Sequence, residues 1–148
     1  MRLARRLALA LSLPLAALSL GACGSGISLD EPIEGPTWRL VLLGDQPVAP
    51  GDDLMRNPQL QFDRSSGRLS GSGGCNRMNG SYTRTASQLR LGQIAATKMA
   101  CADPARNALE TQFFLALQAT ASYRLQGPGR MALLDGTGRT VAVFEAAR

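Results

Sequence analysis

The chain has 148 residues, no histidine and a formal net charge of +5. This length has room for one domain and a targeting segment, but not comfortably for two domains. Without histidine, the chain cannot assemble a Ser-His-Asp triad, a Cys-His dyad or a zinc site of mixed His and Cys ligands.

Much of the positive charge lies at the start of the chain, where Arg2, Arg5 and Arg6 fall within six residues. Loss of residues 1–22 would lower Lys+Arg from 16 to 13 and the net charge to +2, with the remaining cations scattered singly. A nucleic-acid surface needs clustered cations, so we expect no nucleic-acid partner. We also expect no metal and no cofactor. The adjacent Asp52 and Asp53 lack the spacing of a calcium loop and are expected to lie in a solvated turn beside Gly51.

Residues 1–22 combine a basic start with a leucine- and alanine-rich run that is short for a spanning helix, which is typical of a secretory signal. The sequence Leu20-Gly21-Ala22-Cys23 resembles the lipobox of bacterial lipoproteins. That resemblance implies cleavage before Cys23, lipidation of Cys23 and a membrane partner through the attached acyl chains. Gly24 in place of the usual aspartate retention signal favours the outer membrane, with the protein facing the periplasm. The alternative is an ordinary cleaved signal with Cys23 left free.

Residues 24–36 are rich in Gly, Ser, Pro and acidic side chains, so residues 23–36 are predicted to be a lipidated cysteine followed by a flexible tether. The folded domain is predicted to span residues 37–148. Short alternating or turn-bounded segments predict about eight strands, at residues 37–43, 59–63, 67–71, 80–85, 88–96, 122–126, 130–135 and 139–145. The run Asp135-Gly136-Thr137-Gly138 predicts a hairpin between the last two.

One helix interrupts the strands. Asp103-Pro104 supplies an N-cap followed by proline at the first helical position. The inner face is predicted to hold Leu109, Phe113, Ala116, Leu117 and Thr120, with Arg106, Glu110 and Gln118 outside it. The predicted fold class is therefore α+β: a curled antiparallel sheet, partly open and barrel-like, with one packed helix.

The stretch between Gly71 and Cys101 opens with a glycine-rich turn and closes on a second cysteine. Its signatures Gly73-Gly74-Cys75-Asn76, Asn79-Gly80-Ser81-Tyr82 and Thr97-Lys98-Met99-Ala100-Cys101, followed by the Asp103-Pro104 helix, resemble the META domain, the family of HslJ-like heat-shock lipoproteins. The resemblance covers roughly residues 36–146. It implies a small mixed α/β domain of the bacterial envelope, linked to heat stress and antibiotic tolerance, with no established catalytic residue. The motif positions that it marks as structural are Gly74, Cys75, Asn76, Asn79, Gly80, Thr97, Met99, Ala100 and Cys101.

The residue types of this stretch give their own predictions. Asn76 and Asn79 are expected to cap their own backbone in turns, and Met99 is expected to pack in the core. Arg77 and Lys98 are expected to be solvated charges.

Cys75 and Cys101 are predicted to form a disulfide. Export places both in an oxidising compartment, and lipidation of Cys23 leaves them as the one pair available. The alternative is two buried free thiols.

The leading functional hypothesis is a non-enzymatic lipoprotein domain at the outer membrane, with a role in envelope stress or antibiotic tolerance and an unknown envelope protein as partner. A second hypothesis makes the domain a carrier, because a curled sheet closed by a helix can hold an acyl chain or another apolar ligand. A third is an enzyme that uses Cys75 or Cys101 as nucleophile, which would need activation by Lys98, an arginine or a local dipole.

Overall fold

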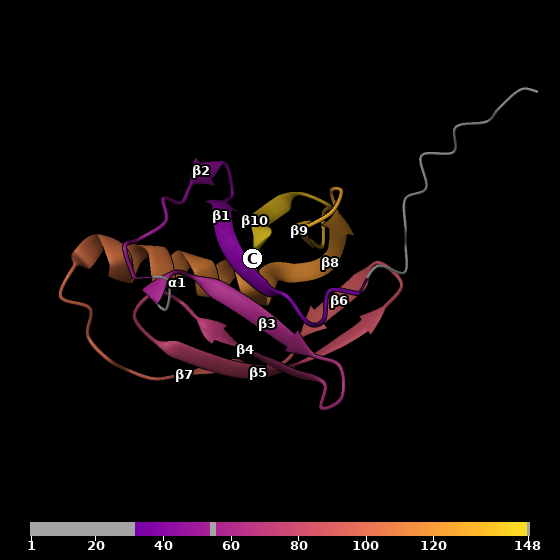
Figure 1. The fold of residues 1–148 in the computed structure, drawn as a ribbon, viewed down its shortest axis with the longest axis horizontal. Helices are drawn as coiled ribbons and strands as arrows, with labels where there is room; N and C mark the ends of the chain where they lie inside the picture. Colours follow the sequence, from indigo (N-terminus) through magenta and orange to yellow (C-terminus); the bar gives the residue numbers. More distant parts are fainter. Residues whose placement is uncertain (1–31, 54–55, 148) are drawn as a thin grey trace, which may run out of the picture.

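The computed structural model describes residues 32–53 and 56–147 (Figure 1). Eight antiparallel strands form a closed barrel in the order β10-β9-β8-β6-β5-β4-β3-β1, and β1 pairs with β10 to close it. The barrel strands are β1 (Thr37–Leu43), β3 (Gln59–Asp63), β4 (Arg68–Ser72), β5 (Arg77–Thr85), β6 (Gln88–Leu91), β8 (Thr120–Leu125), β9 (Arg130–Asp135) and β10 (Thr140–Ala147). Two short strands, β2 (Gln46–Pro47) and β7 (Ala95–Ala96), pair with β1 and β5 outside this ring. The predicted α+β class and barrel-like sheet are confirmed.

The sheet closes fully, whereas the sequence predicted a partly open one. The closing pair runs from Thr37 opposite Ala147 to Leu43 opposite Ala142, so both strands pair over nearly their whole length. The register shifts between Leu40 and Leu42, which marks a β-bulge. Because the bulge reverses the alternation, β1 buries Trp38, Leu40 and Leu43, and not Leu42 as strict alternation predicted.

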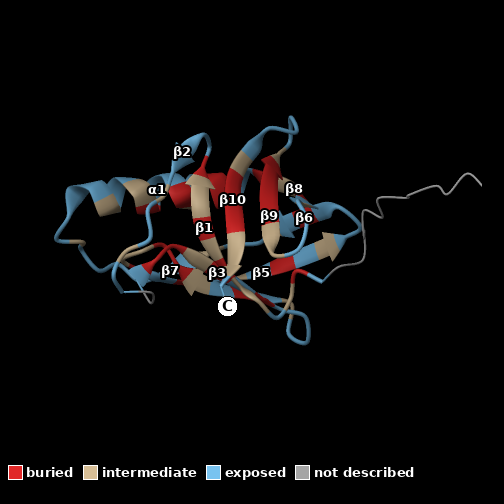
Figure 2. Cartoon of the chain, turned by 45° about the horizontal axis from the view of Figure 1, so that its top comes forward, coloured by how far each residue is buried: buried red, intermediate tan, exposed pale blue. Residues whose placement is uncertain are grey.

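Large apolar side chains fill the interior of the barrel. Fully buried residues come from seven of its eight strands, including Leu40, Leu60, Leu69, Met78, Leu89, Met131, Leu133 and Phe144. Figure 2 shows this burial along β9 and β10, where the buried positions run without a break through the middle of each strand. A barrel of eight strands is just wide enough for its own side chains, and here they occupy it.

Helix α1 (Pro104–Ala119) packs against β10, β9 and β1. It begins where the sequence predicted: Asp103 is the N-cap, and its carboxylate accepts a hydrogen bond from the Ala105 N–H at 2.9 Å. Phe113 and Leu117 are fully buried, and the rings of Phe113 and Phe144 lie 6.0 Å apart. The helix therefore contributes its apolar face to the core of the barrel, as its spacing predicted.

Residues 32–36, named here the N-terminal strap, are part of the folded domain. Ile33 is fully buried, and its carbonyl accepts a hydrogen bond from the Trp38 indole at 2.7 Å. Glu34 forms an ion pair with Arg84 at 3.4 Å and accepts a hydrogen bond from the Tyr82 hydroxyl at 3.0 Å. Residues 33 and 34 of the predicted tether therefore pack against the domain, because one apolar side chain within a polar segment is enough to fix the segment to the core.

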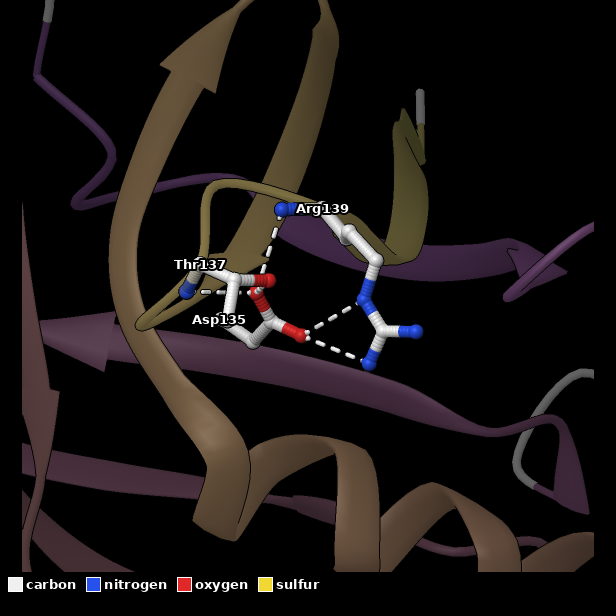
Figure 3. A network of polar contacts seen from close by, with 3 residues as sticks. All are labelled: Asp135, Thr137 and Arg139. Carbon is white, nitrogen blue, oxygen red and sulfur yellow. Dashed lines mark hydrogen bonds and ion pairs between the residues drawn. The ribbon is translucent and has the colours of Figure 1, made fainter.

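The hairpin between β9 and β10 also forms as predicted (Figure 3). One oxygen of the Asp135 carboxylate accepts hydrogen bonds from the Thr137 N–H, the Thr137 hydroxyl and the Arg139 N–H, and the other accepts from the Arg139 guanidinium. The Thr137 hydroxyl, the two backbone N–H groups and the guanidinium hold the pKa of Asp135 well below its usual range, against a smaller opposing effect of burial.

The predicted signal at residues 1–22, the lipidated Cys23 and most of the predicted tether lie outside the described residues. Within residues 32–53 and 56–147, no helix has the length and apolar character needed to cross a membrane.

Candidate functional site

The glycine-rich turn is held by a carboxylate from α1. Glu110 Oε2 accepts hydrogen bonds from the backbone N–H groups of Cys75 and Asn76, at 2.9 and 2.7 Å. Its Oε1 accepts a hydrogen bond from the side-chain amide of Asn76. Glu110 is only 6% exposed, so the sequence prediction that it lies on the outer face of the helix is wrong. A buried carboxylate is stable here because it receives three amide donors.

Asn76 passes this restraint on to the segment that precedes α1. Its Oδ1 accepts hydrogen bonds from the Met99 N–H at 2.6 Å and the Thr97 hydroxyl at 2.9 Å, and its Nδ2 donates to the Met99 carbonyl at 3.2 Å. Asn76 is thus a structural residue, but it connects segments more than twenty residues apart and does not cap its own turn as predicted. Its side-chain amide binds both the N–H and the carbonyl of Met99, as the backbone of a neighbouring strand would.

Cys75 and Cys101 are joined by a disulfide, with their Cα atoms 5.8 Å apart. The predicted pairing is present in the structure, and it closes a loop with a sequence separation of 26. Loop-closure entropy for this length corresponds to about 3.5 kcal/mol of stabilisation. The covalent bond and the Asn76 hydrogen bonds thus restrain the same loop independently.

Two glycines make the turn compatible with this network. A Cβ on Gly73 would lie 2.5 Å from Glu110 Oε2, so a side chain at residue 73 would displace the carboxylate. Gly74 has a φ of +112°, which side chains rarely adopt. A close approach therefore explains the first of these glycines, and a positive φ explains the second.

Residues 97–101, named here the pinned segment, are exposed despite these restraints. Met99 is 66% exposed, so the prediction that it packs in the core is wrong. Thr97, Lys98 and Ala100 are exposed as well, and Cys101 is partly exposed. Asn76 binds the backbone of the segment at Met99, and the side chains of the segment remain in solvent.

Asn79 and Gly80 lie in the middle of β5, away from this site. Asn79 is exposed and pairs with Ser70 and Ala95 across the sheet, so its predicted turn-capping role is wrong. Gly80 permits a close approach, because a Cβ there would lie 3.2 Å from the Gln93 carbonyl oxygen.

A surface hollow of about 550 Å³ lies beside the disulfide. Its lining includes both cysteines, Met99 and two cations, Arg56 and Arg106. A smaller hollow of about 70 Å³ adjoins it and shares Arg56, Gly74 and Arg106 in its lining. The pinned segment therefore forms one wall of a partly cationic depression.

The acidic and cysteine side chains of this site are engaged within the protein. Both oxygens of Glu110 are occupied by amide donors, and both sulfur atoms are in the disulfide. Among the described residues, no group of three or more Cys, Asp or Glu side chains is placed to hold a metal ion. The arginines that line the hollows and the side chain of Met99 are groups of this site that face solvent.

Glu110 is the site residue that the sequence interpretation missed. A signal was present, because residues 110, 113 and 117 follow the i, i+3, i+7 spacing of one helix face. A carboxylate is usually excluded from such a face. Its partners are mostly backbone N–H groups, which leave no mark in a sequence.

These features define a class of protein: a small closed β-barrel with one helix and an exposed segment that a disulfide joins to a glycine-rich turn. The META domain family model matches residues 31–148, and the chain belongs to the META domain family. No curated protein matches the chain.

Solved structures support the same fold. An NMR structure of a protein from Burkholderia xenovorans is 27% identical, covers 78% of this chain and 83% of that one, and has a TM-score of 0.60. A second NMR structure is 23% identical with the same TM-score and covers 77% of this chain and 91% of its own. The crystal structure of a DUF4847 family protein from Bacteroides vulgatus is 15% identical, with a TM-score of 0.53 over 76% of this chain and 93% of that one.

Proposed function

We propose that this chain is a non-enzymatic lipoprotein domain of the bacterial outer membrane, facing the periplasm, that binds a partner through the pinned segment. The observation that carries the proposal is the fixation of an exposed segment by buried groups. Glu110 and Asn76 are both 6% exposed, and the hydrogen bonds of Asn76 end on the backbone of a methionine that is 66% exposed. Burying polar groups costs free energy, which is offset here by the hydrogen bonds that they form, and those bonds hold a solvent-facing segment in one conformation. Preorganisation of this kind favours binding because it lowers the ordering entropy on association.

Two further features support export and anchoring. The Cys75–Cys101 disulfide fits an oxidising compartment. The Leu20–Cys23 sequence fits a lipoprotein signal, and the META family resemblance favours a role in envelope stress or antibiotic tolerance. The carrier hypothesis is not favoured, because fully buried side chains occupy the barrel interior. The cysteine-enzyme hypothesis is not favoured, because both candidate nucleophiles are bonded to each other.

Fractionation of cells tests the anchor. Wild-type protein is expected in the outer-membrane fraction with an added acyl mass, and Cys23→Ser is expected in the soluble periplasmic fraction. Wild-type protein without acyl mass, or Cys23→Ser retained after a carbonate wash, would contradict the lipid anchor.

Site-specific photo-crosslinking tests the binding surface. A photoreactive residue at Met99 is expected to give a discrete crosslinked species in intact cells. The same residue at Arg90, exposed on β6 and outside both hollows, serves as the matched control. Equal crosslinking from the two positions would show that the pinned segment has no special role.

A further inference from the structure

The smaller hollow contains a buried amide group whose donor is unused. Asn57 is 4% exposed, and its Oδ1 accepts a hydrogen bond from the Gly51 N–H at 2.7 Å. Its Nδ2 has no hydrogen-bond partner among residues 32–53 and 56–147. Because the Gly51 bond fixes which end of the amide is the acceptor, the unpaired group is the NH₂ donor of a residue that lines a hollow together with two arginines. Buried donors almost always have a partner, so this one indicates a ligand acceptor.

Arg106 of α1 lies next to the same amide. The position that a Cβ on Gly51 would take is 3.2 Å from both Arg106 Nη2 and Asn57 Oδ1. The guanidinium and the amide are therefore separated by no more than twice that distance, around a space that glycine leaves open. Gly51 has no positive φ, so its lack of a side chain is not required by the backbone.

The charge in this hollow is unbalanced. Its lining contains Arg56 and Arg106, and no carboxylate among the described residues. Arg56 pairs with Asp53 at 3.3 Å, but its side chain is 70% exposed. Arg106 forms no ion pair within residues 32–53 and 56–147. The one acidic residue lining the larger hollow, Asp103, is engaged as the helix N-cap. An anion is therefore the complementary ligand.

We propose that Arg106, Arg56 and the Asn57 amide bind a carboxylate, and that the carboxylate belongs to a peptide segment whose neighbouring apolar residue packs on Met99. This inference rests on the proposed binding function of the pinned segment and names its ligand. A hollow of about 70 Å³ has the scale of a carboxylate with its attached carbon, and planar guanidinium groups match carboxylate geometry. The adjoining hollow of about 550 Å³ adds Met99, Ala100 and Ala102, which suit the apolar part of a polypeptide.

Fluorescence anisotropy on the full chain in mild detergent tests the pocket. The probe is a fluorescein-labelled hexapeptide of alternating leucine and glutamate, and its control carries glutamine in place of glutamate. The glutamate peptide is expected to bind at least about tenfold more tightly than the glutamine peptide, because charge-assisted bonds are lost with the charge. Equal binding of the two peptides would overturn the proposal. Inorganic phosphate is the second probe, and binding as tight as the peptide's would identify a free phosphate site and overturn the peptide assignment.

Two variants locate the binding, each with a matched control. Gly51→Ala fills the open space and is expected to weaken peptide binding at least about tenfold, by the loss of close ion contacts. Gly136→Ala adds the same methyl group in open solvent and is expected to change nothing. Arg106→Gln is expected to weaken binding to a similar extent, and Arg90→Gln to have no effect, so the test stands even if Gly51→Ala folds poorly.

Equal effects of Arg106→Gln and Arg90→Gln would show binding to net charge alone and overturn the pocket. A further experiment separates failure of the carboxylate pocket from failure of the proposed binding surface. Crosslinking from position 99 in cells that persists in the Gly51→Ala protein would keep the pinned segment as the binding surface and remove the carboxylate pocket.

Discussion

Two buried polar clusters lie in different regions of this barrel, and they work in different ways. In the first, Glu110 and Asn76 bind mainly backbone groups of the glycine-rich turn and the pinned segment. In the second, Glu34, Tyr82, Arg84 and Tyr123 bind one another through their side chains. The first cluster fixes the path of an exposed segment, and the second attaches the N-terminal strap to the barrel wall.

Under the proposed function, this difference separates the cluster that would support binding from the one that supports the fold. Side chains that bind backbone restrain a segment without dictating its side chains, so the exposed positions stay available for a partner. Side chains that bind each other are no longer available to a partner. The Arg84 guanidinium is an example: it donates a hydrogen bond to the Tyr123 hydroxyl at 2.7 Å and lies 5.8 Å from the centre of the Tyr123 ring. Burial would lower the pKa of Arg84, but its bond to Tyr123 and the charge of Glu34 raise it above the ordinary value. The three predictions below test this contrast.

The largest effect is expected at the first cluster. Glu110→Ala leaves the N–H groups of Cys75 and Asn76 buried without an acceptor, and should lower the free energy of unfolding by about 4 kcal/mol. Denaturant unfolding of the oxidised protein measures this. Glu145→Ala removes a surface carboxylate that pairs with Arg39 and Arg130, and should cost about 1 kcal/mol or less. Similar losses in both variants would show that the Glu110 bonds do not support the fold.

A smaller loss is expected at the strap. Ile33→Ala removes a fully buried side chain and should lower the free energy of unfolding by about 3 kcal/mol. Hydrogen exchange should then show faster exchange in residues 32–36 and unchanged protection of Met99, because the two clusters do not share residues. Loss of protection at both regions would mean that they unfold as one unit.

The smallest effect is a titration within the second cluster. Burial, with the hydrogen bond to Glu34 and its negative charge, raises the pKa of Tyr82 to about 12. A raised tyrosine pKa gives stability that is complete below pH 10 and is lost as the pH rises through 12. Ultraviolet absorbance after rapid pH jumps measures the ionisation. Glu34→Gln, which removes the charge but keeps an acceptor, should move the pKa of Tyr82 towards 10, and an unchanged value would show that Glu34 has no influence on it.

The sequence predicted the parts of the fold that depend on local patterns. β1 has the predicted bounds, the Asp135–Gly138 turn forms the predicted hairpin, and Asp103 caps the predicted helix. The disulfide followed from having two cysteines left to pair. Each of these predictions depends on residues that are close in the sequence or on the number of cysteines.

The failures share a different cause, which is contact between distant segments. Glu110 is buried by backbone groups 34 and 35 residues away, and Met99 is exposed because Asn76, 23 residues away, holds its backbone. Ile33 looked like part of a tether because its neighbours are polar, and only the barrel shows the core that receives it. Every residue other than proline has the same backbone N–H and carbonyl groups, so a sequence pattern could not have shown which of them bind Glu110 and Asn76.

If Cys23 carries a lipid as proposed, the strap also limits how far the pinned segment can lie from the membrane. Figure 1 shows the described chain beginning beside β6, whereas α1 begins at the far end of the long axis. Because the folded unit starts by residue 32, a lipid on Cys23 would leave nine residue steps, at most about 30 Å of extended chain. The proposed carboxylate pocket, which Arg106 near the start of α1 lines, would then lie at the end of the domain opposite the attachment. A partner would therefore have to come to the membrane-proximal layer of the periplasm, because the domain could not travel far to meet it.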